Sequence, residues 1–300
     1  MKTLLLGSTG LLGQAVAREA RRRGVEPREA ARRGAPIQVD IADDAALRTL
    51  LDAERPDLVV NCAALVDMDL CERDPALAWR VNARPLAFLV EWSRASGGRL
   101  LHVSTDHYFT EGYAAAHDET APVSLVNEYA RSKFAGEAFA LTAANALVLR
   151  TSIVGIRGWE QPTFAEWAID AVENDRPVVL FSDAWSSSID VPSFARAAFD
   201  MVEAGASGLY NLAAHEVYTK EQFVREIARQ CGQNLTGAKT GSVRVLSTPR
   251  AHCLGLDVRR AEAVLGYGLP HLAELVASVL QQYKEKSSHE VRHIASHRNA

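Results

Sequence analysis

The segment that decides the fold is Thr3–Gly13, which reads TLLLGSTGLLG. A short apolar run leads directly into three glycines spaced Gly-x-x-Gly-x-x-Gly, and the helical periodicity of Leu11–Arg23 follows. The first glycine permits a tight turn, the second lets backbone approach a pyrophosphate, and the third lets helix and strand pack closely. Free N–H groups and the positive end of the helix dipole then face the anion. The segment therefore predicts the start of a dinucleotide-binding unit, with these contacts: Gly7, Ser8, Thr9, Gly10, Leu11, Leu12 and Gly13.

The rest of the first half alternates between short apolar runs and longer stretches with helical periodicity. This alternation predicts an α/β fold, a doubly wound parallel (Rossmann) sheet covered by helices on both faces. The predicted strands are Thr3–Leu6, Ile37–Val39, Leu58–Asn61, Leu100–Ser104 and Ala146–Arg150, and the further helices are Asp44–Ala53, Pro75–Ser96 and Glu128–Thr142. We interpret Val25–Arg33 as an edge-like strand, because Pro27 and its charges suit a sheet interior poorly.

The regular alternation of predicted strands and helices ends at about Gly155. The second half predicts helices and short strands in mixed order, namely helices Phe164–Asn174, Val191–Glu203, Lys220–Cys231 and Leu269–Lys284 and strands Pro177–Phe181, Gly208–Leu212 and Val243–Leu246. We expect an NAD(P)-binding Rossmann domain over residues 1–155. Residues 156–285 are expected to form mainly a smaller mixed α/β substrate-binding region, with some segments returning to the sheet.

Residues 286–300 are polar and predict a frayed tail. His289, His293 and His297 recur every four residues there. Because the support for a helix there is weak, we interpret the spacing as accidental and expect no metal.

Composition narrows the function classes. The 300 residues carry 33 basic and 37 acidic side chains, a net charge of −4 that argues against a nucleic-acid binder. No apolar run approaches the ~18–20 residues of a membrane helix, so no membrane partner is expected. The apolar run at the start of the chain is too short for a secretion signal. The four cysteines show neither a CxxC pair nor metal-ligand spacing. We therefore expect a reduced cytoplasmic protein.

The end of the second strand selects between the two nicotinamide dinucleotides. An acidic residue there would bind the ribose hydroxyls of NAD, but the chain offers Arg32, and a guanidinium suits the 2′-phosphate of NADP. Glu26 or Glu29 could be in register instead, so NADPH is preferred and NADH stays possible. Asp40 and Ile41 would lie near the adenine, although Asp40 could instead cap the next helix.

Tyr129 and Lys133 lie four residues apart on a predicted helix and therefore share one face. A neighbouring ammonium is expected to lower the pKa of the phenol, ordinarily ~10, towards the working range of an acid–base group. Ser104-Thr105-Asp106 ends the fifth strand, at the sheet edge where such folds bind ligands. A hydroxyl there could hold a carbonyl while the tyrosine protonates it.

These motifs together resemble the extended short-chain dehydrogenase/reductase family, in the branch that includes dTDP-4-dehydrorhamnose reductase and a regulatory subunit of methionine adenosyltransferase. The likeness reaches about Tyr283. Its other matching stretches are Asn61–Ala64, Asp69 with Cys71-Glu72, Val81–Ala83, Arg150–Ser152, Gly208–Asn211 and Leu256-Asp257.

The resemblance implies an enzyme that passes hydride from a nicotinamide to the C4 ketone of a nucleotide-linked deoxysugar. Tyr129 would give the proton, Lys133 would also hold the nicotinamide ribose, and Thr105 would orient the carbonyl. Cys62, Ala63 and Ala64 would line the cofactor, and Asn82 would either brace the active-site end of the sheet or be purely structural. Relatives pair through helices flanking the sheet, so a homodimer is possible.

The departures from this family lie on the substrate side. The usual Asp-Tyr-Val-Phe reads Asp106-His107-Tyr108-Phe109, an expected aromatic is Ile153 and an expected valine is Met68. These residues are therefore candidates for contacts with a different sugar or carrier. Cations for a substrate diphosphate are available at Arg150, Arg157 and Arg250, and Arg250 is favoured because it follows Pro249 in the second region.

Two other functions stay open at this point. One is a sugar-nucleotide epimerase or dehydratase that keeps its cofactor bound. Dehydratases of the superfamily tend to carry Asp-Glu after the active-site hydroxyl, where this chain has Asp106-His107. The other is a dinucleotide-binding regulatory subunit without catalysis. The altered substrate half favours it and the complete set of Thr105, Tyr129 and Lys133 opposes it.

Overall fold

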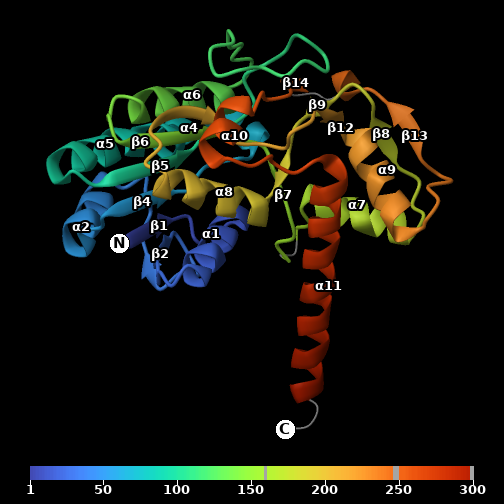
Figure 1. Cartoon of the computed structure of the whole chain (residues 1–300), viewed down its shortest axis with the longest axis horizontal. Helices are drawn as coiled ribbons and strands as arrows, with labels where there is room; N and C mark the ends of the chain where they lie inside the picture. The colour runs from blue at the N-terminus through green and yellow to red at the C-terminus, as the bar shows by residue number, and fades with distance from the viewer. Residues whose placement is uncertain (159–160, 246–249, 298–300) are drawn as a thin grey trace.

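Seven parallel strands form the central sheet, in the order β11-β6-β5-β4-β1-β2-β3 (Figure 1). The computed structural model of the chain describes residues 1–158, 161–245 and 250–297. The strands of the sheet are β1 (Thr3–Leu6), β2 (Arg28–Ala31), β3 (Ile37–Gln38), β4 (Leu58–Asn61), β5 (Arg99–Val103), β6 (Ala146–Arg150) and β11 (Gly208–Asn211). The predicted doubly wound α/β fold is confirmed, and β11 joins the sheet from the second half of the chain.

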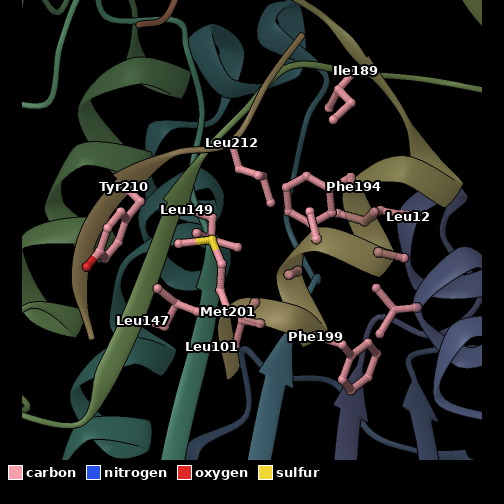
Figure 2. Close-up of a cluster of buried hydrophobic side chains, with 14 of the residues drawn as sticks. Leu12, Leu101, Leu147, Leu149, Ile189, Phe194, Phe199, Met201, Tyr210 and Leu212 are labelled. Atoms are coloured by element: carbon pink, nitrogen blue, oxygen red, sulfur yellow. The ribbon is translucent and has the colours of Figure 1, made fainter. Parts of the chain in front are cut away.

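Helices cover both faces of this sheet because its strands are apolar on both sides. Leu5 packs with one set of helices, whereas Leu4 and Leu6 pack with the other. The first face carries α1 (Leu11–Arg22) and α8 (Val191–Glu203), and the second carries α2 (Asp44–Glu54), α5 (Arg84–Ser96) and α6 (Glu128–Ala140). Figure 2 shows Phe194 and Met201 of α8 with Leu101 of β5 and Leu149 of β6 in one apolar cluster.

Two predicted elements of the first half need correction. β2 is not an edge strand, since it pairs with β1 on one side and β3 on the other. Pro27 lies just before it, and its buried residues are Ala30 and Ala31. The single predicted helix Pro75–Ser96 is two helices, α4 (Pro75–Asn82) and α5, because Pro85 has no backbone N–H with which to continue α4.

The second half has its own apolar cluster, formed by α7 (Phe164–Glu173), α9 (Lys220–Cys231) and the last helix. Short strands join these helices in three small sheets: β7 (Ile153–Val154) with β10 (Ile189–Asp190), β9 (Trp185–Ser186) with β12 (Tyr218–Thr219) and β14 (Cys253–Leu254), and β8 (Val179–Phe181) with β13 (Lys239–Gly241). Two further short helices are α3 (Met68–Arg73) and α10 (Arg259–Leu265).

The predicted strand Val243–Leu246 is instead a 3₁₀ turn over Val243–Val245. The Asp183 carboxylate accepts hydrogen bonds from the Val243 N–H and the Ser242 hydroxyl, which holds the backbone in a turn. Leu246 lies outside the described residues.

The last helix, α11, runs over Leu272–His297, where the sequence predicted an end at Lys284 and a frayed tail. No glycine or proline interrupts residues 285–297, so no residue breaks the helix there. Figure 1 shows this helix projecting away from the rest of the chain. The side chains of His289, His293 and His297 lie outside the described part. Among the described residues, no helix is both long and apolar enough to span a bilayer.

A buried ion pair fixes α6 against the sheet. Arg150 of β6 donates from Nη2 to Glu137 Oε1 over 2.6 Å, and the two side chains are 4% and 2% exposed. The Ser104 hydroxyl donates to the other oxygen of Glu137 over 2.7 Å. On the opposite side, Gly136 lets α6 approach α4 so closely that a Cβ there would lie 2.3 Å from the Asn82 carbonyl oxygen. The orientation of α6 is thus set from both sides.

Replacing Glu137→Gln should lower the free energy of unfolding by about 3–5 kcal/mol, because the Arg150 guanidinium would stay buried without its counter-charge. Urea unfolding followed by circular dichroism measures the loss. Glu91→Gln is the matched control, since Glu91 pairs with Arg48 on the surface and should contribute less than about 1 kcal/mol. Equal losses in the two variants would contradict the anchoring role of Glu137.

Gly13→Ala should destabilise the protein by about 3 kcal/mol, despite the better helix propensity of alanine. The added Cβ would lie 2.1 Å from the Gly7 carbonyl oxygen, so the turn and α1 must separate. Gly268→Ala is the control, because the nearest atom to its added Cβ is a carboxylate oxygen of Glu262 at 3.8 Å. A loss under 1 kcal/mol for Gly13→Ala, by the same urea titration, would show that this contact is not restrictive.

Candidate active site

A cavity of about 320 Å³ opens at the carboxyl ends of β1 to β4. Nine of the predicted cofactor residues line it: Gly7, Thr9, Gly10, Arg32, Asp40, Ile41, Cys62, Ala63 and Ala64. These residues come from four separate strand ends, and only the parallel order of the sheet brings them together.

The glycine turn leaves backbone donors at this cavity. Gly7 has φ +80°, and a Cβ on it would lie 2.7 Å from the Ala63 nitrogen. The first α1 bond runs from the Gln14 N–H to the Gly10 carbonyl, so the N–H groups of the preceding helical residues have no partner within the helix. Ser8 is buried, and its hydroxyl has no hydrogen-bond partner among the described residues. These N–H groups and the Ser8 hydroxyl can therefore donate hydrogen bonds to phosphate oxygens.

Leu11, Leu12 and Gly13 contribute backbone N–H groups to the turn rather than side chains. The side chains of Leu11 and Leu12 pack with the core on the α1 face of the sheet. Gly13 packs against the Gly7 carbonyl. Any contact of these three residues with a ligand would therefore come from their N–H groups.

Arg32 lies between the 320 Å³ cavity and an adjoining open groove, and it lines both. Ser8, Thr9 and Arg33 line the same groove. The acidic alternatives are engaged elsewhere: Glu26 accepts a hydrogen bond from Arg21 Nε at 3.0 Å, and Glu29 pairs with Arg21 Nη2. Glu29 also borders the groove, so its carboxylate is close by, although it is paired with Arg21, which it shares with Glu26.

Asp40 does not cap the following helix. The N-cap of α2 is Asp43, whose carboxylate accepts from the N–H groups of Ala45 and Ala46. The Asp40 carboxylate accepts from the Ala42 N–H over 3.0 Å and borders the cavity with Ile41. Asp40 is therefore available for its predicted position beside an adenine ring.

Thr105, Tyr129 and Lys133 are buried and do not line this cavity, but Lys133 interacts electrostatically with Cys62 in its wall. Asn127 caps α6 by accepting from the Ala130 N–H, which places Tyr129 in the first turn and Lys133 one turn later. The Thr105 hydroxyl lies close enough to the Tyr129 phenol to oppose the rise in the pKa of that phenol. Lys133 Nζ donates to the Val103 carbonyl over 2.7 Å.

The protonation of this group differs from the sequence-based expectation. Burial raises the pKa of Tyr129 to about 12, so the predicted lowering by Lys133 is wrong for this structure. Burial also lowers the pKa of Lys133 to about 8, while the Glu137 carboxylate opposes that change. A phenolate or an ammonium loses hydration when buried, and here that loss is the largest cause of both shifts.

A second cavity, of about 490 Å³, lies between segments of the two halves of the chain. His107 lines it and meets the Tyr129 ring edge-on, with the ring centroids 5.5 Å apart. Cys62 lines the first cavity and interacts electrostatically with Lys133. Tyr129 therefore packs against a residue of the second cavity, and Lys133 interacts with a residue of the first, although neither lines a cavity itself.

The second cavity has mainly apolar walls, with aromatic side chains from Phe164, Trp167 and Phe181. Of the predicted substrate residues, Met68, His107 and Arg250 line it. The Asp106 side chain lies beneath this surface, and the residue is 1% exposed.

The structure places the other candidates elsewhere. Ile153 lies in β7 and packs against the core rather than lining this cavity. Arg150 is committed to Glu137 and is not available to a diphosphate. Arg157 donates from Nη2 to the Gln161 carbonyl over 3.1 Å.

Lys220 and Ser152 also line the second cavity, and neither was identified from the sequence. Lys220 is the first residue of α9, after the capping box of Thr219 and Gln222, and its Nζ lies 4.6 Å from the centroid of the Phe164 ring. The helix start was predictable, but the cavity that Lys220 faces depends on how α9 packs. No cluster of three or more metal-ligating side chains occurs among the described residues.

Asn82 braces the loop that separates the two cavities. Its side-chain oxygen accepts from the Leu65 N–H over 2.8 Å, and its amide donates to the Leu65 carbonyl and the Ser132 hydroxyl, each over 3.1 Å. Because Ser132 adjoins Lys133 on α6, Asn82 ties the loop after β4 to the helix of the Tyr129 group. Its expected bracing role is consistent with these contacts.

Known proteins are similar to this chain over most of its length. A probable low-salt glycan biosynthesis reductase of Haloferax volcanii is 31% identical, over 96% of this chain and all of its own. The dTDP-4-dehydrorhamnose reductase of Mycobacterium tuberculosis is 32% identical, over 77% of this chain and 76% of its own. A Bacillus anthracis dTDP-4-dehydrorhamnose reductase, solved in complex with NADP, has the same fold, with a TM-score of 0.84, 19% identity and coverage of 94% and 100%.

A family model described as the RmlD substrate binding domain matches residues 1–285. This range includes the glycine turn, the Tyr129 group and both cavities. It ends within α11, so the match covers both halves of the fold. The resemblance inferred from the motifs is thereby confirmed, and the chain belongs to the RmlD substrate binding domain family.

Proposed function

We propose that the protein is an NAD(P)H-dependent reductase of a nucleotide-linked 4-keto-deoxysugar. The observation that carries this proposal is that Tyr129 packs against His107 of the second cavity while Lys133 interacts with Cys62 of the first. One cavity suits a dinucleotide and the other a sugar nucleotide, so a hydride donor and a ketone could meet at the phenol. The relatives named as dTDP-4-dehydrorhamnose reductases support the same class of reaction.

The first cavity fits a nicotinamide dinucleotide. The unpartnered Ser8 hydroxyl and the N–H groups at the start of α1 would bind its diphosphate. Gly7 leaves room for close approach of that group, and Arg32 would pair with a 2′-phosphate. When bound, the reduced nicotinamide supplies a hydride.

The residues of the chain would handle the proton and the charge. With its pKa raised to about 12, Tyr129 keeps its proton at neutral pH and can donate it to a ketone oxygen. The Thr105 hydroxyl would orient that oxygen. The Lys133 ammonium, supported by Glu137, would stabilise the phenolate formed as the proton leaves.

The second cavity suits the sugar nucleotide. Phe164, Trp167 and Phe181 offer flat faces for a base, and Arg250 offers a cation for the diphosphate. His107 and Met68 lie at the Tyr129 end, next to buried Asp106. The sugar ring would therefore lie between His107 and the first cavity.

Tyr129→Phe should lower kcat by about 10²–10⁴-fold, because it removes the phenol that would donate the proton. The assay follows NADPH absorbance with a panel of nucleotide 4-keto-sugars, and fluorescence titration should give an NADPH Kd within about threefold of wild type. Tyr113→Phe, at an exposed tyrosine, is the control and should be fully active.

Other outcomes of that assay would contradict the reductase. Isomerised or dehydrated sugar without net oxidation of NADPH would indicate an epimerase or dehydratase. Tight cofactor binding with no turnover of any sugar would indicate a regulatory subunit. More than a tenth of wild-type kcat in Tyr129→Phe would remove that residue from the proton step.

Arg32→Ala should raise the KM for NADPH by about 10–100-fold and leave the KM for NADH unchanged, because only NADPH carries the 2′-phosphate. Arg33→Ala is the neighbouring control, since Arg33 lines the groove but not the 320 Å³ cavity. Its effect on the NADPH KM should stay within about threefold. A wild-type preference for NADH above tenfold would overturn the role given to Arg32.

A further inference from the structure

Lys220 and Arg250 place two cations in the wall of the second cavity. Among the described residues that line this cavity, none is acidic, and most are apolar or aromatic. Charged side chains in such surroundings are normally paired with an opposite charge or held by hydrogen bonds. Two cations in this wall therefore call for an anion that the lining residues do not supply.

The Lys220 ammonium has no close polar partner within the chain. Its Nζ lies 4.6 Å from the centroid of the Phe164 ring, and its side chain makes no hydrogen bond or close ion pair among the described residues. Asp106 interacts with it electrostatically but is buried and does not line the cavity. Burial raises the pKa of Asp106 to about 7, so at neutral pH this carboxyl balances the Lys220 charge only in part. The three N–H donors of the ammonium are thus available to a ligand.

The position of Lys220 at the start of α9 is unfavourable for a cation. Lys220 is the first residue of this helix, where the positive end of the helix dipole opposes an ammonium. Thr219 and Gln222 form the capping box, so the Lys220 side chain is not needed to begin the helix. An anion next to Lys220 would be stabilised by the ammonium and by the helix end together.

Arg250 also lacks a polar partner within the chain. Its side chain makes no hydrogen bond or close ion pair among the described residues, and its Nε is buried. Burial lowers the pKa of His107 to about 4, and the charges of Lys220 and Arg250 lower it further. Both cations therefore act near the His107 ring, which meets the Tyr129 ring edge-on in the same cavity wall.

We propose that Lys220 and Arg250 together bind the diphosphate of the substrate, with one cation on each phosphate group. This inference deepens the proposed function, on which it rests for the identity of the anion. A diphosphate carries two adjacent anionic groups, so it can pair with both cations at once, whereas a single phosphate can satisfy them only in part. Lys220 then becomes a residue that selects a sugar carried on a diphosphate.

This placement agrees with the chemistry proposed at Tyr129. In a hexopyranose, the C4 ketone and the C1 oxygen that carries the diphosphate lie at opposite ends of the ring. With C4 at the Tyr129 phenol, C1 points away from that phenol and into the second cavity. Lys220 and Arg250 would therefore hold the end of the sugar that is distant from hydride transfer.

The test is a calorimetric titration of the protein saturated with NADP⁺, so that the first cavity is filled and the second is left to the probe. The probes are dTDP, UDP and GDP, each compared with its own monophosphate. For the pair that binds most tightly, wild type should bind the diphosphate at least about tenfold more tightly than the monophosphate, because the second phosphate reaches the second cation.

Lys220→Met and Arg250→Met should each weaken diphosphate binding by about 10–100-fold. In one of the two, the Kd values for diphosphate and monophosphate should come within about threefold, because that variant lacks the cation of the terminal phosphate. Lys220→Arg keeps the charge and should stay within about fivefold of wild type. Lys239→Met, at an exposed lysine outside the cavity, is the matched control and should bind like wild type.

Lys220→Gln should show the same loss as Lys220→Met, and it decides the question if the methionine variant does not fold. Wild-type Kd values within threefold for diphosphate and monophosphate would overturn the two-cation site. A change below threefold in diphosphate binding on removal of the Lys220 charge would also overturn it. A higher KM for the keto-sugar with unchanged diphosphate binding would assign Lys220 to the sugar and contradict the proposal.

The titration contains no keto-sugar, so its outcome is separate from that of the reductase assay. Protein that binds the diphosphate as expected but oxidises no NADPH with any sugar would refute the proposed reductase and support the two-cation site. Protein that reduces a sugar but does not prefer the diphosphate would refute the two-cation site alone.

Discussion

The orientation of α6 is the constraint on which the candidate site depends. Tyr129, Lys133 and Glu137 are spaced four residues apart, so they lie along one face of the helix. Glu137 is held by Arg150 of β6 and by the Ser104 hydroxyl, all of them buried. This contact at one end of the face fixes the direction in which Tyr129 and Lys133 project. Gly136 and Asn82 complete the constraint from the α4 side.

Burial then determines how these side chains can act. It favours the neutral forms of Tyr129, Lys133 and Asp106, while Glu137 and Lys220 partly restore the charged forms of their neighbours. The Tyr129 phenol of a site built this way keeps its proton at neutral pH. That property suits the reduction of a ketone, because each turnover consumes one proton together with the hydride.

Much of the site could be predicted from the sequence because its residues belong to short local patterns. The glycine spacing, the four-residue spacing of Tyr129 and Lys133, and the hydroxyl at the end of β5 each require only one turn or one strand end. The assignments that needed correction depend on distant neighbours. In the sequence Arg150 is a candidate cation for a diphosphate, whereas in the structure it pairs with Glu137. The pKa of Tyr129 likewise depends on burial by several elements.

By itself, the sequence determined the α/β class, the parallel sheet, the dinucleotide-binding turn and the identity of the Thr105, Tyr129 and Lys133 group. Only the tertiary structure decided that Lys220 shares a cavity with His107 and Arg250, and that Asp106 lies buried against Thr105. The reason is physical: hydrophobic periodicity and turn chemistry act over a few residues. Cavity lining and desolvation depend on packing between segments more than a hundred residues apart.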